Sequence, residues 1–315
     1  MLTISIMLFA VLVAMAVFQS IFAFAFARVL SRAASDERQS EYTPTVSILM
    51  SLRGADDGLA DNIERLLSQD YPNYELRVIV DNRQDPAWRV VADTAERLQT
   101  KNFHLSTLRN RRSTCGFQNS SFSQAIDELP TTCEVVVLVD GDLTVHPTAL
   151  RELVAPLNNK DIGGSFGNRW FAPQDSRWGS WTRYLWNVAA IVPMYLFGIP
   201  WGGCMAIRRD ALEQSELVKT WRNSMVHDAP TKAALSKCSM KLAFVPTLMM
   251  VINEPCELAF AHDFIKRQMM WTRLYHPNFG PVFLHAIATT LIMFAAMSLA
   301  VLAIQRRDVT VLTWS

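Results

Sequence analysis

The stretch Glu134–Pro147 places two aspartates directly after a run of apolar residues. Val135–Val139 contains no polar residue, and Asp140-Gly141-Asp142 follows it at once. A short apolar run that ends in turn-forming residues predicts a strand buried on both faces, as in a parallel sheet. Ligands of such sheets bind beyond the carboxyl ends of the strands. Both carboxylates are therefore expected where such a fold does its chemistry.

The side chains of Asp140 and Asp142 supply hard oxygen ligands. Oxygen ligands of this kind favour Mg²⁺ or Mn²⁺ carried by a diphosphate. A surface turn is the alternative interpretation, because aspartate and glycine are both common in turns. The motif alone therefore indicates a candidate metal site, and the residues that accompany it decide between the two.

The composition narrows the class of protein. The chain has 315 residues, enough for one large domain or two modest ones, and 50% of them are hydrophobic. This share is high for a purely soluble protein and directs attention to membrane segments. A formal net charge of +1 argues against electrostatic binding of nucleic acid. The five cysteines are scattered and match no zinc or disulfide spacing, which predicts reduced thiols that face the cytosol.

The N-terminal residues 3–27 carry no charge and are long enough to cross a bilayer as a helix. A cleaved signal peptide is the alternative, because small residues near the end of this stretch resemble a cleavage site. The absence of early basic residues and the length of the stretch favour a retained anchor over residues 1–30. Arg28 and Arg32 then predict, by the positive-inside rule, that the following residues are cytoplasmic.

Strand-like and helix-like stretches alternate through the first half of the chain. Strands are expected at residues 45–52, 74–81, 103–108 and 135–139, and helices at 58–67, 85–98 and 120–129. Asp85-Pro86 is typical of a helix start, because aspartate caps free N–H groups and proline fits the first turn. The alternation predicts an α/β fold with a doubly wound, mostly parallel sheet.

The pattern of the second half is less regular. Strands are expected at residues 162–171, 202–207 and 241–245, and helices at 208–214, 230–237 and 259–275. Residues 178–199 are aromatic and apolar but are interrupted by polar residues and a proline. They predict either a helix at the membrane interface or a buried core helix. The interfacial alternative places four aromatic residues near the lipid headgroups: Trp181, Tyr184, Trp186 and Tyr195.

The complete division of the chain adds a second membrane segment. The chain is expected to comprise the anchor at 1–30, a polar linker at 31–44, a catalytic domain at 45–262, an amphipathic interfacial segment at 263–279, a transmembrane helix at 280–304 and a tail at 305–315. The tail is apolar and ends abruptly, which raises the expectation of a truncated chain.

Several motifs then occur in the order found in family 2 glycosyltransferases. They are Val46–Gly54, Asn62–Leu76, Asp81 with Asp85–Ala87, Asp140–Asp142, Gly202–Asp210, His227–Asp228 and Arg267–Trp271. Over residues 45 to 275 the chain resembles this family, and more closely its ceramide glucosyltransferase-like members, which act on lipids. The joint order of the motifs is far more specific than any one of them.

The resemblance implies a glycosyltransferase A fold and a membrane-bound, inverting hexosyltransferase of glycolipid or sphingolipid biosynthesis. The donor would be a UDP-sugar such as UDP-glucose, and the acceptor a lipid hydroxyl such as that of ceramide. Asp142 would be the more direct ligand of Mg²⁺ or Mn²⁺, and Asp140 would serve the metal or the ribose. Asp81 would bind uracil or ribose, and Arg53 the base or a phosphate.

The resemblance also assigns the chemistry of transfer. Asp228 would be the general base that takes the proton of the acceptor hydroxyl, and Arg267 and Trp271 would contact the diphosphate. The alternative for Asp228 is a helix N-cap, since Ala229-Pro230 follows it. For the α-helical segment that holds Arg267 and Trp271, the alternative is a basic-aromatic face toward anionic lipid.

Three positions depart from the motifs of the resembled family. Met270 stands where relatives have an arginine, and Lys266 or Arg273 would then supply the charge. His227 stands where relatives have an acid, and it would either tune the base or be exposed. Residues 117–121 lack the lysine that relatives often have. These departures leave open a polysaccharide synthase-like transferase and a weakly active, nucleotide-binding membrane scaffold.

Overall fold

The computed structural model describes residues 2–35, 41–277 and 279–313. The chain divides into two compact units. The larger unit is Ala33–His276, and the smaller one combines Met1–Arg32 with Pro277–Ser315. The linker predicted at residues 31–44 includes residues 36–40, which lie outside the described residues.

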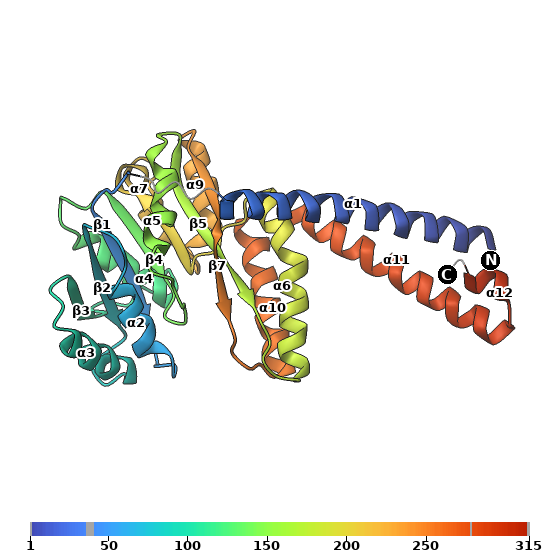
Figure 1. The fold of residues 1–315 in the computed structure, drawn as a ribbon, viewed down its shortest axis with the longest axis horizontal. Coiled ribbons are helices and arrows are strands. Elements are labelled where there is room, and N and C mark those ends of the chain that lie inside the picture. Colours follow the sequence, from blue (N-terminus) through green and yellow to red (C-terminus); the bar gives the residue numbers. More distant parts are fainter. Residues whose placement is uncertain (1, 36–40, 278, 314–315) are drawn as a thin grey trace. The chain divides into compact units, whose positions relative to one another are not determined.

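The larger unit is built on a seven-stranded sheet in the order β3-β2-β1-β4-β6-β5-β7 (Figure 1). The strands are β1 (Val46–Leu52), β2 (Tyr74–Val80), β3 (Phe103–Thr107), β4 (Val135–Val139), β5 (Ile162–Phe171), β6 (Cys204–Arg208) and β7 (Lys241–Ile252). Strands β1 to β4 run parallel, β6 runs antiparallel to both of its neighbours, and β7 is parallel to β5. The prediction of an α/β fold with a mostly parallel sheet is confirmed.

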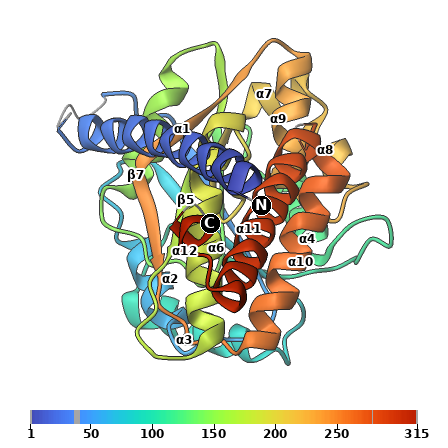
Figure 2. The same cartoon turned by 90° about the vertical axis from the view of Figure 1, so that its right-hand side faces the viewer.

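Helices cover both faces of this sheet. The helices of the larger unit are α2 (Leu59–Leu67), α3 (Pro86–Leu98), α4 (Phe117–Asp127), α5 (Ala149–Val154), the 3₁₀ helix η1 (Ala155–Asn158), α6 (Trp178–Phe197), α7 (Arg209–Gln214), α8 (Leu217–Trp221), α9 (Asp228–Lys237) and α10 (Leu258–Tyr275). Val135 and Val137 of β4 belong to one core cluster with α2, α3 and α5. Val136 and Leu138 belong to a second cluster with α4 and with α7, α8 and α9, which lie together in Figure 2. Cover on both faces explains the unbroken apolar sequence of β4.

Most predicted elements lie within a few residues of their observed bounds, and the differences have local causes. The Asp85 side chain accepts a hydrogen bond from the Ala87 N–H at 2.9 Å, which confirms the predicted helix cap. Strand β7 continues to Ile252, well past its predicted end at residue 245. The prediction stopped before Pro246, which has no N–H to donate. In the structure this proline falls in a register irregularity of the β5–β7 pairing, where such a residue is tolerated.

Two described helices have the length and apolar composition of membrane spans, Leu2–Arg32 within α1 (Leu2–Ser35) and α11 (Phe279–Arg306). The short helix α12 (Val309–Thr313) follows α11. A signal sequence near an N-terminus has the same composition, so this observation supports membrane association without choosing between anchor and signal.

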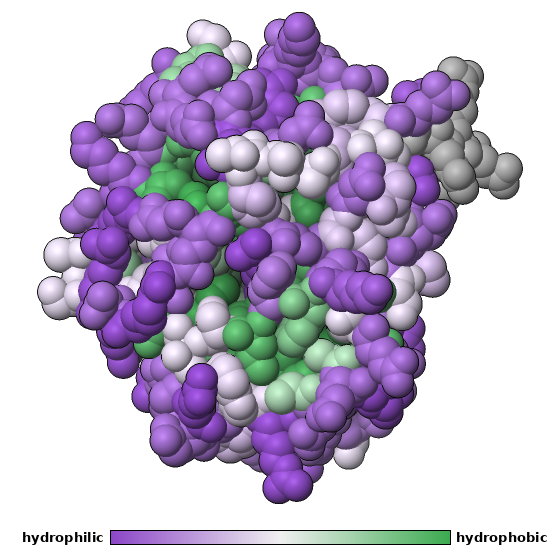
Figure 3. All heavy atoms as spheres, turned by 90° about the vertical axis from the view of Figure 1, so that its left-hand side faces the viewer, coloured by the Kyte–Doolittle hydropathy of each residue, from purple (hydrophilic) through white to green (hydrophobic). Residues whose placement is uncertain are grey.

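Helix α6 departs from the usual arrangement of a surface helix. On the side of the molecule that carries β3 and α3, the surface is mostly hydrophilic (Figure 3). Helix α6 instead exposes large apolar side chains, Trp178, Trp181, Leu185, Val188 and Leu196. Its buried positions include three polar residues, Ser180, Arg183 and Asn187. Of the aromatic residues expected near headgroups, Trp181 is 45% exposed, and Tyr184, Trp186 and Tyr195 are half-buried.

Candidate active site

A cavity of about 300 Å³ lies beyond the carboxyl end of β4. Five of the predicted site residues line it, Asp140, Asp142, Asp228, Arg267 and Trp271. They come from the end of β4, the start of α9 and the middle of α10, which are far apart in the sequence. The fold therefore brings the two motif aspartates together with the predicted base and the predicted diphosphate contacts.

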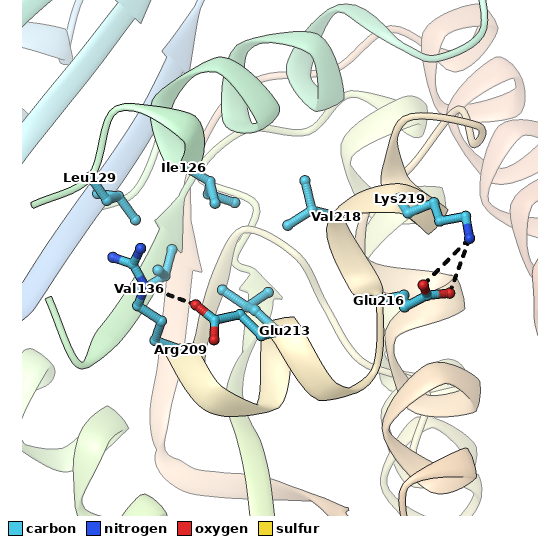
Figure 4. A pocket seen from close by; sticks show the side chains of 9 residues that line it. Ile126, Leu129, Val136, Arg209, Glu213, Glu216, Val218 and Lys219 are labelled. Atoms are coloured by element: carbon cyan, nitrogen blue, oxygen red, sulfur yellow. Dashed lines mark hydrogen bonds and ion pairs between the residues drawn. The ribbon is translucent and has the colours of Figure 1, made fainter. Parts of the chain in front are cut away.

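A second crevice of about 250 Å³ lies among α4, β4, α7 and α8 (Figure 4). Its charged residues already pair with each other: Arg209 Nε lies 3.2 Å from Glu213 Oε1, and Lys219 Nζ lies 3.2 Å from Glu216 Oε2. The rest of its lining is largely apolar. Because none of the predicted site residues reaches this crevice, the cavity beyond β4 is the candidate active site.

The two motif aspartates sit in different surroundings. Asp140 Oδ1 accepts a hydrogen bond of 2.8 Å from Gln118 Nε2, and the Asp140 N–H donates to the Gly203 carbonyl at 3.0 Å. Burial, together with the negative charges of Asp140 and Glu254, raises the pKa of Asp142 to about 6. Two carboxylates thus converge on one cavity with part of their repulsion unrelieved, and a divalent cation would relieve it. Within the described ranges, no group of three or more His, Cys, Asp or Glu side chains is placed to hold a metal.

Gly203, just before β6, lies so close to Asp140 that only a residue without a side chain fits there. A Cβ atom at this position would lie 2.5 Å from Asp140 Oδ2 and would also meet the Trp201 ring. We expect Gly203→Ala to displace one of these side chains, to cost about 1–3 kcal/mol of folding free energy and to reduce enzymatic activity. Thermal unfolding and initial rates would measure both effects. Gly58→Ala is the control, because its Cβ would meet only Asn62 Nδ2 at 3.9 Å; equal behaviour of the two variants would contradict the prediction.

Asp228 is the first residue of α9, and His227 holds the N-cap position. The alternative interpretation of Asp228 as the N-cap is therefore wrong by one residue. Asp228 Oδ1 accepts from the Ala229 N–H at 2.7 Å, and Oδ2 accepts from the Gly202 N–H at 3.2 Å. These two bonds orient the carboxylate toward the cavity while each oxygen keeps a further lone pair.

His227 is not exposed, contrary to one of its two predicted roles; only 4% of it is accessible. Its Nε2 lies 3.0 Å from the Gly202 carbonyl and must carry the proton, since a carbonyl only accepts. The edge of the imidazole also packs against Phe122 and Trp221. Because Gly202 bonds both His227 and Asp228, the histidine fixes the loop that positions the carboxylate.

Helix α10 directs Arg267 and Trp271 into the cavity and Met270 away from it. Met270 is 44% exposed and does not line the cavity. Lys266 and Arg273 are also exposed and absent from the lining, so neither replaces a charge there. The departure at Met270 therefore changes the outer face of the helix.

Arg53 and Asp81 lie outside the cavity but next to each other. Arg53 Nε is 3.4 Å from Asp81 Oδ2, and the two side chains are 59% and 25% exposed. They follow β1 and β2, which are neighbours in the sheet, and β1 also adjoins β4. The two residues thus occupy the same edge of the sheet as the motif aspartates, one and two strands away.

The sequence patterns did not predict four polar side chains of the cavity: Gln118, Arg169, Arg183 and Glu254. Gln118 lies in the segment where the resembled family often has a lysine, and it bonds Asp140 instead. Arg183 is one of the polar residues that interrupt the apolar stretch 178–199, and the sequence pattern gave it no other role. A charge inside an apolar segment was the available signal, since such a side chain must be paired or functional.

A match to a family model identifies the class of enzyme to which this fold belongs. The sequence matches the family model described as glycosyl transferase family 21 over residues 8–314, and the chain belongs to that family. It is a glycosyltransferase with a glycosyltransferase A fold.

Two solved structures are similar to the chain. The mannosyltransferase PcManGT from Pyrobaculum calidifontis, in complex with GDP-Man and Mn²⁺, is 18% identical with a TM-score of 0.62, over 95% of this chain and 87% of that one. Glucosyl-3-phosphoglycerate synthase from Mycobacterium tuberculosis, in complex with Mn²⁺, UDP and glucosyl-3-phosphoglycerate, is 15% identical with a TM-score of 0.44, over 77% of this chain and 82% of that one.

Proposed function

We propose that this enzyme transfers a hexose, such as glucose, from a UDP-sugar to the hydroxyl group of a membrane lipid such as ceramide. The observation that carries the proposal is the single cavity lined by Asp140, Asp142, Asp228, Arg267 and Trp271. It combines carboxylates for a cation, an arginine for phosphate and a carboxylate for proton transfer. The catalytic domain would span residues 45–262, with residues 263–279 completing the site.

The donor end of the cavity fits a nucleoside diphosphate with a divalent cation. Asp142 would be the direct ligand of Mg²⁺ or Mn²⁺, Asp140 a second ligand or a contact of the ribose, and phosphate oxygens would complete the coordination. The ion would act as a Lewis acid that stabilises the departing diphosphate. The similar mannosyltransferase was crystallised with GDP-Man and Mn²⁺, which supports this assignment. Arg53 and Asp81 would hold the uracil and ribose on the adjacent strand ends.

Asp228 would act as the general base. It would take the proton of the acceptor hydroxyl as that oxygen forms a bond to the anomeric carbon. The bond from that carbon to the diphosphate oxygen would break on the opposite side, and UDP would leave with the electron pair. Attack from the far side inverts the configuration of the sugar. Arg267 would contact the diphosphate and Trp271 would pack over the donor.

Helix α6 supports a lipid acceptor. It carries polar residues toward the protein and apolar residues outward, and its one charged residue, Arg183, is buried. It packs along α10, which exposes Lys266 and Arg273 (Figure 1). An outward apolar face beside basic side chains suits the headgroup region of a membrane. We place α6 at the cytoplasmic membrane surface, where it would guide lipid to a cavity that Arg183 also lines.

Leu185→Glu tests this placement. Leu185 is 62% exposed on α6, and a charge there would oppose contact with lipid. We expect transfer to a lipid in vesicles to fall about tenfold, which corresponds to a loss of about 1.4 kcal/mol in the contact between α6 and the lipid. The affinity for UDP should be unchanged. Lys101→Gln, an exposed change of equal charge in the loop between α3 and β3, is the control. Wild-type transfer by Leu185→Glu would exclude α6 from the lipid contact.

The function itself is tested with membranes that contain the protein. They would be incubated with a panel of radiolabelled UDP-sugars and Mn²⁺ or Mg²⁺, and the lipid extract would be separated. Label in one discrete lipid is the expected result. Label in polymer would indicate a polysaccharide synthase-like transferase instead. UDP binding without any transfer would indicate a nucleotide-binding scaffold.

A further inference from the structure

We propose that Arg169 of β5 is the phosphate-binding guanidinium of this cavity. The inference rests on the proposed nucleotide-sugar function and adds a residue to it. Arg169 lines the cavity together with Asp140, Asp142 and Asp228. It belongs to neither of the two motifs, at the end of β4 and on α10, that are expected to hold the diphosphate.

Three aromatic rings position the Arg169 guanidinium. Its Cζ lies 4.9 Å from the ring centre of Phe264, 5.4 Å from that of Phe171 and 5.7 Å from that of Trp201. Contacts of this kind engage the planar group through its faces. The N–H donors lie along the edge of the plane, so the rings orient the group without using its hydrogen bonds.

The donors of Arg169 have no protein partner in the described part of the chain. No hydrogen bond or ion pair joins its guanidinium to another described residue, although three carboxylates lie near enough to act on its charge. Burial lowers the pKa of Arg169 to about 10, so it stays protonated at neutral pH. The three carboxylates offset its charge through space, but the oriented N–H donors remain without an acceptor among the described residues until a ligand enters the cavity.

Arg183, in the same cavity, differs from Arg169 because its guanidinium is paired with protein groups. Its Nη2 donates a 2.6 Å hydrogen bond to the Glu254 carbonyl, and its Nη1 lies 3.9 Å from Glu254 Oε2. It also stacks on Phe171 with its Cζ 4.2 Å from the ring centre. Arg183 therefore holds the cavity wall, whereas the edge of Arg169 is left for a ligand.

The ligand chemistry follows from the geometry of the group. A guanidinium edge binds the paired oxygens of a phosphate through two parallel hydrogen bonds. Asp140 and Asp142, the proposed cation ligands, lie in the same cavity, so a phosphate there would meet the cation and Arg169 together. The phosphate can come from the diphosphate of the donor or from a phosphorylated acceptor headgroup.

The test compares UDP with uridine on the full-length protein in lipid nanodiscs with Mn²⁺. We expect Arg169→Gln to weaken UDP binding by about tenfold to a hundredfold, the usual loss for charged hydrogen bonds. Uridine, which has no phosphate, should bind as before. Arg169→Lys keeps the charge but loses the planar edge, and we expect an intermediate loss. The control is Arg89→Gln, whose side chain is 88% exposed on α3.

The outcomes separate the alternatives. Unchanged UDP affinity with a raised KM for a phosphate-bearing acceptor only would support the same phosphate site with the acceptor as its source. Unchanged UDP affinity and acceptor KM in a folded Arg169→Gln would overturn the inference. If that variant does not fold, wild-type behaviour of Arg169→Lys would overturn it equally. Failure of the wild-type protein to bind UDP would instead reject the proposed function.

Discussion

Asp228→Asn will reduce sugar transfer by about 10²–10⁴-fold, the range typical of a lost general base. An asparagine amide cannot take the proton that the acceptor hydroxyl must lose. The variant will still bind UDP with wild-type affinity, because the role proposed for Asp228 is proton transfer and not contact with the diphosphate. The amide oxygen can accept from the Ala229 N–H as the carboxylate does, at 2.7 Å, and only the longer bond of 3.2 Å from the Gly202 N–H is lost. We therefore expect a folded protein that is defective in kcat.

The measurement is an initial rate with radiolabelled UDP-sugar, beside calorimetric binding of UDP. Asp210→Asn is the matched control. Asp210 also lies in the first turn of a helix, α7, and its Oδ1 accepts from the following N–H, that of Ala211, at 2.8 Å. It does not line the cavity. Near-normal turnover of Asp228→Asn would show that another group is the base.

Asp142→Asn will abolish the response to divalent metal and lower transfer by at least about a hundredfold, since a Lewis acid supplies several kcal/mol to a leaving diphosphate. The neutral amide is a much weaker ligand than a carboxylate. Asp57→Asn, an exposed aspartate in the loop before α2, should retain wild-type metal titration. Metal-stimulated transfer by Asp142→Asn would remove this residue from the metal site.

The wild-type enzyme should also lose metal affinity in acid. The pKa of Asp142 is raised to about 6 from its ordinary value of 3.8, so protons compete with the cation below pH 6. The apparent affinity for Mn²⁺ should then fall by about tenfold for each further pH unit. Titration of Mn²⁺ at pH 7.5, 6 and 5 would detect this dependence. A flat profile would contradict it.

The raised pKa of Asp142 also affects the stability of the metal-free protein, in the opposite direction with pH from its effect on metal affinity. Ionisation of Asp142 is disfavoured in the folded state, so stability should decrease as the pH rises from about 3.8 through 6. Asp142→Asn removes this cost and should raise the melting temperature at pH 7 in metal-free buffer. A higher melting temperature together with lost transfer would show that the repulsion between the two carboxylates destabilises the fold and is retained because activity needs both of them.

The three departures from the motifs of the resembled family remove no necessary group from the cavity of the folded protein. Met270 faces outward and removes nothing from the cavity. Gln118 occupies the segment without lysine and donates to Asp140. His227 is buried next to Asp228 and bonds the Gly202 carbonyl. The cavity thus keeps its chemistry with a different set of supporting side chains.

Local sequence determined several secondary-structure elements, among them the strand that leads to the motif aspartates. The apolar run Val135–Val139, the Asp85-Pro86 helix start and the two long uncharged stretches depend on neighbours a few residues away. Periodicity and capping report such short-range preferences directly. The order of the motifs then predicted the residues Asp140, Asp142, Asp228, Arg267 and Trp271, all of which meet in one cavity.

Only the tertiary structure decided what surrounds them. Whether Arg183 and Arg169 are surface charges, wall or ligand contacts depends on Glu254, Phe264 and Trp201, which lie far along the chain. The reversed direction of β6 and the inverted faces of α6 likewise depend on strand pairing and packing between distant segments. Burial and long-range pairing set the energy of a charge, and no local pattern encodes them.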